Sequence, residues 1–371
     1  MSKKWKVKLS NWFLRRYAAK HGRLLDKSTL NSQTHLESIV IYSTTALGDF
    51  MFNTPAIRAV RQRYPDAYIT LVAHKKNQEL VDNGIYYNRV VYWDNKVKSL
   101  PVLVKSLKEH QPELALILHS HLPYDVISAV MSGVKYIIRD NYMNGISGME
   151  EWLSNYVFNY YGHFVRRKLE LVNILGCDSS DVSMEIPSPF QAGIKNPEYT
   201  VIGMQIGAST ESRCWPVAHY VKLVDYLSSH HPAVRIVLIG GGTDIARVEA
   251  MLQQVSATSR GIIENKIGKT GLQQLITLID GFDCLVTGDT GPLHLAVAVK
   301  TKTISLFVTA DSRSTGPIQN TELHRIIQVS RTGYTLPLEA ISPMGVITPE
   351  RVYSELASHV DIAHEQNHAL G

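Results

Sequence analysis

Two glycine-containing turns carry side chains that are suited to group transfer. The first is the Gly48-Asp49 pair, which follows the apolar run 38–43. A carboxylate at such a turn can accept a proton from a hydroxyl group, so Asp49 is a candidate general base. The alternative is that Asp49 only orders its loop. Since the turn lacks the GxxxxGK[ST] pattern, it is not a phosphate-binding P-loop.

The second turn is the segment 288–294 (GDTGPLH), in which Gly291 and Pro292 favour the start of a helix. Free N–H groups and the positive end of the helix dipole bind phosphates at such a start, and the Thr290 hydroxyl adds a donor. We expect Asp289 to order the turn or to meet the hydroxyls of a sugar. His294 either bonds a phosphate or packs in the core.

Two further segments have the composition of ligand-binding loops. In 205–216 (QIGASTESRCWP), the Ser209 and Thr210 hydroxyls can donate to phosphate oxygens. Arg213 can neutralise the charge on a departing diphosphate, because its planar fork suits phosphate geometry. In 240–244 (GGGTD), Asp244 either holds ribose hydroxyls or caps a plain turn.

Each of these segments follows a predicted strand. From residue 38 onward, short β-branched runs alternate with helical patterns, which predicts βαβ units and parallel sheets covered on both faces. We expect strands at 38–43, 68–73, 90–93, 113–119, 134–138, 200–205, 233–239, 284–286 and 303–307. A helix is predicted over 54–64, with Thr54 as its N-cap and Pro55 at its first position. Ligands of open α/β sheets bind beyond the carboxyl ends of the strands, where the motifs stand.

The proline-rich segment 186–199 interrupts this alternation and reads as an interdomain linker. We therefore expect an arm over 1–35, one α/β domain over 36–185 and a second α/β domain over 200–345. A C-terminal helix is expected within 346–371. Two such domains predict a binding cleft between them.

Composition excludes several classes of protein. The 371 residues are 44% hydrophobic and 19% charged, which is typical of globular proteins and not of fibrous or disordered ones. The three cysteines are widely spaced, so neither a disulfide framework nor a zinc site is predicted. No signal peptide and no membrane-spanning run is expected.

Positive charge is concentrated at the N-terminus. Residues 1–27 hold nine Lys or Arg and one acid, Asp26. The aromatic and apolar residues among them recur at helical spacing: Trp5, Leu9, Trp12, Phe13 and Tyr17. This pattern predicts that residues 1–30 contact an anionic membrane surface, or alternatively form a helix packed on the protein itself. A nucleic-acid partner is not expected, because the remainder carries no matching basic stripe.

Taken together, these segments resemble glycosyltransferase family 9, the ADP-heptose:lipopolysaccharide heptosyltransferases. The resemblance spans roughly residues 36–360. It rests on Gly48-Asp49 with Thr54-Pro55 and Arg58, on Gly207-Ala208 with Arg213 and Trp215-Pro216, on Gly240-Gly241 with Asp244, and on Asp289-Thr290-Gly291-Pro292 with His294 and Ala296.

The resemblance implies an α/β fold of the GT-B type, with two Rossmann-like domains facing a central cleft and a last helix that crosses back to the first domain. It implies an inverting transfer of heptose from ADP-heptose to a lipopolysaccharide core sugar, without a metal or cofactor. Asp49 would be the general base, and Arg213 stands where the family usually has a diphosphate-contacting lysine. Donor-binding residues would be Ser209, Thr210, Asp244, Lys269, Thr270, Asp289, Thr290, Gly291 and His294, with Lys269 and Thr270 near the adenine.

Anionic acceptor groups would suit a set of residues in the first domain, namely Gly48, Arg58, Arg61, Lys75 and Lys76. Such an enzyme would be cytoplasmic and peripheral on the inner membrane. Three alternatives remain: the same reaction with another sugar or acceptor, including a protein acceptor; a sugar-nucleotide epimerase of similar fold; and a non-catalytic module that binds a sugar nucleotide.

Overall fold

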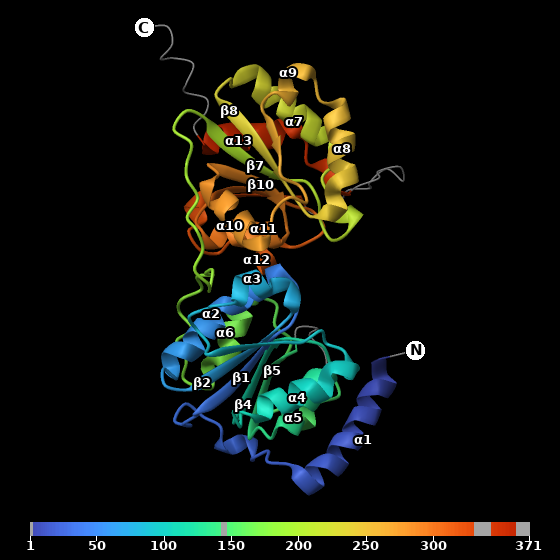
Figure 1. Ribbon diagram of the computed structural model, residues 1–371, viewed down its shortest axis with the longest axis vertical. Coiled ribbons are helices and arrows are strands. Elements are labelled where there is room, and N and C mark those ends of the chain that lie inside the picture. The colour runs from blue at the N-terminus through green and yellow to red at the C-terminus, as the bar shows by residue number, and fades with distance from the viewer. Residues whose placement is uncertain (1–2, 142–146, 330–342, 361–371) are drawn as a thin grey trace. The chain divides into compact units, whose positions relative to one another are not determined.

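The computed structural model describes residues 3–141, 147–329 and 343–360 of the chain. The chain forms two compact units, Met1–Pro189 (unit 1) and Phe190–Gly371 (unit 2). Each unit contains a six-stranded sheet in which all paired neighbours are parallel (Figure 1).

The sheet of unit 1 has the strand order β3-β2-β1-β4-β5-β6. Its strands are β1 (Ser38–Ser43), β2 (Tyr68–Ala73), β3 (Arg89–Tyr92), β4 (Leu114–His119), β5 (Tyr136–Asp140) and β6 (Asn155–Val157). All six residues of β1 are buried, because strands flank it on both sides and helices cover both faces of the sheet. Figure 1 shows helices α2 and α6 on one face and α4 and α5 on the other.

The helices of unit 1 are α1 (Lys3–His21), α2 (Leu47–Arg63), α3 (Gln78–Val81), α4 (Leu100–Lys108), α5 (Tyr124–Ser132) and α6 (Phe164–Asn173). Short 3-10 helices lie at η1 (Lys27–Thr29), η2 (Lys75–Asn77), η3 (Val97–Ser99) and η4 (Glu150–Trp152).

Helix α2 corrects one prediction. We expected it to begin at Thr54, but it begins at Leu47 and contains Pro55 in its interior. Proline cannot donate the backbone hydrogen bond that the Met51 carbonyl would otherwise accept. The Thr54 hydroxyl donates to that carbonyl instead, at 2.9 Å, so the helix continues through the proline. Asp49 consequently lies inside the first turn of the helix and not in a preceding loop.

The N-terminal segment packs on unit 1, which was one of its two sequence-based interpretations. Residues 3–21 form helix α1, which packs against α5 and contributes the fully buried Leu14 to the core of unit 1. The segment after it is fixed as well, because the Thr29 hydroxyl lies 2.8 Å from the Tyr136 hydroxyl. The N-terminal segment is therefore an integral layer of unit 1.

Unit 2 repeats the strand order of unit 1, as β12-β11-β10-β7-β8-β9. Its strands are β7 (Thr200–Gln205), β8 (Val234–Ile239), β9 (Ile263–Asn265), β10 (Cys284–Gly288), β11 (Lys302–Phe307) and β12 (His324–Gln328). In both sheets the first strand lies centrally, with the second and third to one side and the fourth, fifth and sixth to the other. This is the order of Rossmann folds, with ligand sites at the carboxyl ends of the central strands.

The helices of unit 2 are α7 (Val217–His230), α8 (Ile245–Gln254), α9 (Ala257–Arg260), α10 (Leu272–Gly281), α11 (Gly291–Ala298), α12 (Ser312–Thr315) and α13 (Pro349–His359). Its 3-10 helices are η5 (Glu211–Arg213), η6 (Gly242–Asp244), η7 (Thr321–Leu323) and η8 (Pro343–Val346). Helices α10 and α11 cover one face of the sheet, and α7 and α8 cover the other (Figure 1).

Helix α13, within the predicted C-terminal segment, packs on the sheet of unit 2. Its side chains Val352 and Leu356 are fully buried in the core of unit 2, and the helix contacts α7, β11 and β12. Helix α13 is thus part of unit 2. Residues 361–371, which belong to the same predicted segment, lie outside the described residues.

The strand predictions agree closely with the structure in the sheet interiors. Strands β1, β2 and β7 have the predicted bounds, and β3, β4, β5, β8, β10 and β11 differ by one or two residues. Strands β6, β9 and β12 were missed. All three are at sheet edges, where a strand is only partly buried and its apolar pattern is weak.

Candidate active site

Asp49 lies at the carboxyl edge of the unit 1 sheet. It follows β1 and occupies the first turn of α2, where the positive end of the helix dipole favours a negative side chain. The side chain is 31% exposed, so solvent and ligands can reach the carboxylate. Gly48 precedes it in the same turn and is partly buried. The position fits a general base that must meet a substrate hydroxyl.

His119 is an ionisable neighbour of Asp49 that only the structure reveals. It is the last residue of β4, which pairs with β1, and its Nδ1 lies 3.6 Å from Asp49 Oδ1. Burial, together with the positive charges of Lys168, His121, Arg139 and Arg167, lowers the pKa of His119 to about 2. The imidazole is therefore neutral near pH 7 and adds no positive charge beside the carboxylate.

Sequence reasoning did not single out His119. A signal was available, because His119 is a polar residue at the end of an apolar strand, and ligand sites gather at such ends. What the sequence lacked was the strand order, which makes β4 the direct neighbour of β1.

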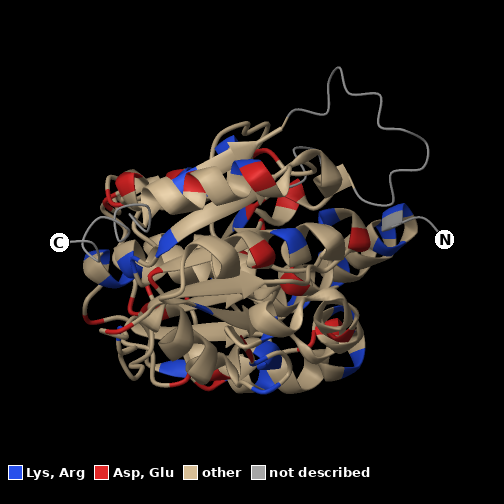
Figure 2. Cartoon of the chain, turned by 90° about the horizontal axis from the view of Figure 1, so that it is seen from above, with Lys and Arg blue, Asp and Glu red and all other residues tan. Residues whose placement is uncertain are grey.

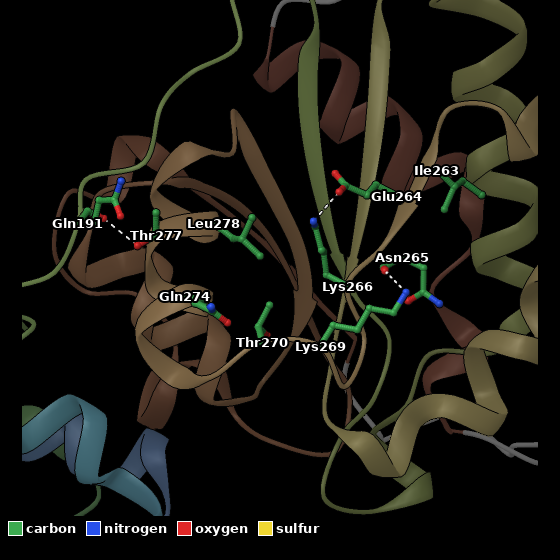
Figure 3. Close-up of a pocket in the computed structure, with 10 residues that line it drawn as sticks. All are labelled: Gln191, Ile263, Glu264, Asn265, Lys266, Lys269, Thr270, Gln274, Thr277 and Leu278. Carbon is green, nitrogen blue, oxygen red and sulfur yellow. Dashed lines mark hydrogen bonds and ion pairs between the residues drawn. The ribbon is translucent and has the colours of Figure 1, made fainter.

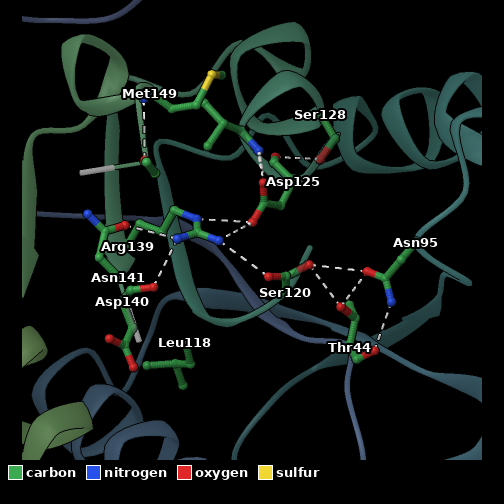
Figure 4. A network of polar contacts seen from close by, with 12 residues as sticks. Thr44, Asn95, Leu118, Ser120, Asp125, Ser128, Arg139, Asp140, Asn141 and Met149 are labelled. Carbon is green, nitrogen blue, oxygen red and sulfur yellow. Dashed lines mark hydrogen bonds and ion pairs between the residues drawn. The ribbon is translucent and has the colours of Figure 1, made fainter. Parts of the chain in front are cut away.

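The loop between β1 and Asp49 is held by buried amide and hydroxyl groups (Figure 4). The Thr44 hydroxyl donates to Asn95 Oδ1 at 2.6 Å and lies 2.8 Å from the Ser120 hydroxyl, while Asn95 Nδ2 donates to the Thr44 carbonyl at 2.9 Å. Asn77 Nδ2 donates to the carbonyl of Thr45 at 3.1 Å. These contacts fix the backbone that leads into α2 and so position Asp49.

Beneath this loop lie five buried ionic side chains. Arg139 pairs with Asp125 at 3.0 Å, and Asp140 is shared by Arg167 and Lys168. Burial lowers the pKa of Lys168, while the carboxylates of Asp140 and Asp49 oppose that shift. Arg139 also donates to the Ser120 carbonyl at 3.3 Å, which joins this cluster to the loop contacts (Figure 4).

Two of the predicted acceptor residues serve the fold instead. The Arg58 guanidinium is buried and pairs with Asp181 at 2.8 Å and with Glu185 at 2.6 Å. Arg61 donates to the carbonyls of Pro65 and Ala67 and to the side chain of Asn88. These partners already engage both guanidinium groups, so an acceptor could bind Arg58 or Arg61 only by competing with contacts of the fold.

Lys75 and Lys76 remain accessible. Both lie in η2, directly after β2, at the same sheet edge as Asp49. The Lys75 ammonium lies 5.2 Å from the centre of the Tyr92 ring. An anionic acceptor group could therefore be met by these two cations without breaking an ion pair of the fold.

In unit 2, the structure brings several predicted donor residues together at the end of β10. Arg213 Nη2 lies 2.6 Å from Asp289 Oδ2, and His294 Nε2 lies 3.8 Å from Asp289 Oδ1. Thr290 is the N-cap of α11, and its hydroxyl lies 3.1 Å from that of Thr287. Gly291 and its neighbour Pro292 begin the helix, as the sequence predicted. A guanidinium beside a helix N-terminus is a suitable combination for binding a diphosphate.

Asp244 caps the turn that follows β8, which was one of the two roles that the sequence predicted for it. Its carboxylate accepts a hydrogen bond from the Gly241 N–H at 2.8 Å. It also lies so close to Gly207 that a Cβ there would fall 1.9 Å from Asp244 Oδ1. Gly207 is therefore required for close contact between two loops. Ser209 and Thr210 are exposed beside this contact, where their hydroxyls can meet a ligand.

A pocket of about 680 Å³ lies between β9 and α10 (Figure 3). Lys269 and Thr270, which were assigned to the neighbourhood of the adenine, line it together with Lys266 and Gln274. Lys269 Nζ donates to the Asn265 carbonyl at 2.9 Å. A second pocket, of about 420 Å³, is lined by Asp244, Arg247 and neighbouring residues.

No cluster of three or more His, Cys, Asp or Glu side chains that could hold a metal ion occurs among the described residues. Within the same ranges, no helix is both long and apolar enough to cross a membrane. The three cysteines are buried and unpaired by disulfides.

Comparison with known proteins decides the family. The model of glycosyltransferase family 9 (heptosyltransferase) matches residues 103–332, which is more than half of the chain. The chain belongs to glycosyltransferase family 9. It is therefore a glycosyltransferase of the heptosyltransferase family, with a fold of the GT-B type.

Individual relatives agree with this assignment. Lipopolysaccharide heptosyltransferase 3 of Escherichia coli K12 is 25% identical over 285 residues, which cover 71% of this chain and 80% of the relative. Lipopolysaccharide heptosyltransferase 2 of Salmonella typhimurium is 24% identical, over 86% of this chain and 97% of the relative. The solved structure of the Escherichia coli ADP-heptose lipopolysaccharide heptosyltransferase II has the same fold, with a TM-score of 0.71 at 20% identity, over 87% of this chain and 98% of that one.

Proposed function

We propose that this family 9 member transfers a heptose from ADP-heptose to a sugar of the lipopolysaccharide core, with inversion at the anomeric carbon. The observation that carries the proposal is the position of Asp49, a partly exposed carboxylate in the first turn of a helix and beside a neutral imidazole. The names of the relatives support the choice of a heptose and of a lipopolysaccharide acceptor.

In the proposed reaction, an acceptor hydroxyl oxygen attacks the anomeric carbon while its proton passes to Asp49. The bond between the anomeric carbon and the diphosphate oxygen breaks, and ADP leaves with the electron pair. A single displacement of this kind inverts the configuration. His119 orients the carboxylate through its ring nitrogen 3.6 Å away, and Lys75 and Lys76 attract anionic groups of the acceptor.

The donor side is assigned to unit 2. Arg213 and the N-terminus of α11 neutralise the charge that builds on the departing diphosphate. Asp289 holds the guanidinium of Arg213 at 2.6 Å and so fixes its direction. Hydroxyls of Ser209, Thr210 and Thr290 would donate to phosphate oxygens. The pocket that contains Lys269 and Thr270 is large enough for a nucleoside.

We also propose that the enzyme works in the cytoplasm at the surface of the inner membrane, held there by its N-terminal segment. A lipopolysaccharide acceptor is amphiphilic, so a location beside a lipid surface keeps the enzyme close to it. The basic, aromatic composition of α1 supports this location.

The test is to offer the purified protein ADP-heptose with lipopolysaccharides truncated at successive core sugars, and to follow the release of ADP. Release should depend on one of the truncated acceptors and should exceed that with ADP-glucose. If ADP-glucose served equally well, the donor assignment would be wrong. If no lipopolysaccharide were glycosylated while another acceptor was, the acceptor assignment would be wrong.

A further inference from the structure

We propose that the outward face of α1 is an oriented docking surface for an anionic lipid bilayer. The first reason is that α1 has two faces with different partners. On the inward face, Leu14 is fully buried in the core of unit 1, with Val7, Tyr17 and Ala18 packed around it. The helix is therefore anchored, and its remaining face is turned away from the core.

Specific polar contacts fix the rotation of the helix about its axis. The Asn11 side chain donates to the Gly148 carbonyl at 2.7 Å and accepts from Trp152 Nε1 at 2.9 Å. Arg15 forms a two-point ion pair with Glu151, at 3.0 and 3.1 Å. Gly148 has a φ of +84°, and a Cβ there would lie 3.0 Å from a Val7 methyl group, so the Val7 side chain packs directly against the Gly148 backbone. The helix consequently cannot turn its other face inward.

That other face is apolar and aromatic. Trp5, Leu9, Trp12 and Phe13 are 43%, 54%, 57% and 37% exposed. At about 100° per residue, their spacing places all four within roughly 100° of the helix circumference. Trp and other large apolar side chains on one face of a helix are typical of helices that lie in the membrane interface.

Cations flank this strip, and α1 contains no acidic residue. By the same helical spacing, Lys4 and Lys8 lie on one side and Lys6 on the other, and all three are exposed. By this spacing, Arg16 and Lys20 lie on the strip itself, and the guanidinium carbon of Arg16 is 5.1 Å from the centre of the Trp12 ring. The helix beside the N label of Figure 2 carries this positive charge in blue.

This charge pattern indicates which partner binds the outward face of α1. A bilayer with anionic lipids offers both an apolar layer for the aromatic rings and negative headgroups for the cations. A second copy of α1 would bring like charges together and is therefore disfavoured. The inference rests on the proposed function only in naming the inner membrane as the lipid surface. Because α1 and Asp49 belong to the same compact unit, the bound helix would restrict the orientation of the catalytic residue toward the bilayer.

The experiment uses the full chain in co-sedimentation with vesicles of phosphatidylglycerol mixed with phosphatidylcholine, and with vesicles of phosphatidylcholine alone. The double substitution Trp5→Ala/Trp12→Ala should weaken binding to the anionic vesicles by at least about tenfold, because two large apolar groups no longer enter the interface. The matched control is Val102→Ala, which removes a 72% exposed apolar side chain from α4 of the same unit and should bind as the unchanged protein does.

A second pair of variants tests the charges. Lys4→Glu/Lys8→Glu should remove most of the salt-sensitive binding, whereas Lys98→Glu/Lys105→Glu, on exposed positions outside α1, should retain it. Anionic-vesicle binding that survives the tryptophan substitutions, or that is equal on neutral vesicles, overturns the proposal. Dimerisation that depends on the tryptophans, without vesicle binding, would assign the face to a second copy of the chain.

Transferase activity separates this proposal from the proposed function. All four variants should release ADP from ADP-heptose with a short soluble acceptor at the rate of the unchanged protein. Vesicle binding by a protein without any transferase activity would contradict the proposed reaction and leave the docking surface supported.

Discussion

The substitution Asp49→Asn isolates the proton-accepting role of this residue. Asparagine has nearly the same shape as aspartate, and its carbonyl oxygen can still face His119, which lies 3.6 Å from the native carboxylate. The side chain is partly exposed, so the change leaves no buried cavity. What is lost is the base. Since general-base catalysis contributes about 10²–10⁴-fold, we expect kcat to fall by at least about 10²-fold.

The position of Asp49 also indicates how much the Asp49→Asn substitution should lower the stability of the protein. Asp49 is in the first turn of α2, where a negative charge stabilises the helix by about 0.3–1 kcal/mol. Its loss should lower the Tm by no more than about 4 °C for a unit of this size. Asp66→Asn is the matched control, because Asp66 is an exposed carboxylate at the opposite end of α2. This control should change neither kcat nor the Tm appreciably.

The assay follows ADP release and, separately, the rise in Tm when ADP-heptose is added, because a ligand that binds the folded state stabilises it. Asp49→Asn should keep the ligand-induced rise in Tm, whereas Arg213→Ala should lose most of it. If folded, donor-bound Asp49→Asn retained most of its turnover, another group would be the base and the mechanism would be wrong. An equal loss of donor binding in both variants would contradict the division of roles between the two residues.

Three further outcomes follow from the contacts of the fold. Arg58→Ala should destabilise unit 1 by about 2 kcal/mol, seen as a lower Tm, because the carboxylates of Asp181 and Glu185 lose the buried guanidinium that pairs with them; a rise in the acceptor KM without a change in Tm would refute this structural role. The pKa of His119 is about 2 in the folded protein, and its ordinary value is 6.5. Below pH 6.5 the unfolded chain therefore binds a proton that the native chain does not. The free energy of unfolding should consequently fall by up to about 1.4 kcal/mol for each pH unit below 6.5. In thermal melts from pH 7 to pH 4, the Tm of His119→Gln should decline less steeply than that of the unchanged protein. The Tm of His35→Gln, at an exposed position, should decline as steeply as that of the unchanged protein. Equal slopes of Tm against pH in the unchanged protein and both variants would contradict the lowered pKa of His119. Burial raises the pKa of Cys177 and of Cys284 to about 12, so neither thiol should react with a disulfide reagent at pH 8 until the protein is unfolded, as absorbance would report.

Much of the fold could be predicted from the sequence because the local pattern of residue types determines most of the strands and several helix starts. The run 38–43 (SIVIYS) has a β-branched centre, Ile39-Val40-Ile41, followed by Tyr42, which is typical of a buried strand, and β1 has the predicted bounds. The Gly291-Pro292 pair predicted the start of α11 for an equally local reason, since proline fits the first position of a helix. The position of Asp49 after the first strand followed from the same alternation of elements.

Prediction from local sequence failed where a side chain replaced a missing backbone hydrogen bond. Pro55 predicted a helix start, and the sequence gives no direct sign that the neighbouring Thr54 hydroxyl would satisfy the Met51 carbonyl. Three of the four edge strands, β6, β9 and β12, were missed for a related reason. Their partners across the sheet, and not their own composition, hold them in extended form.

The tertiary structure alone decided which charged residues are available for chemistry. Arg58 and Asp49 lie on the same helix, yet contacts with Asp181 and Glu185, more than 120 residues away, commit Arg58 to the fold. His119 reaches Asp49 because β4 pairs with β1, a strand order that no local pattern encodes. The sequence determined that α1 is basic and aromatic, but only packing decided that Leu14 turns inward and Trp12 outward. The sequence determines the chemical type of each side chain. Whether that side chain is free to bind a substrate depends on neighbours that long-range packing brings together.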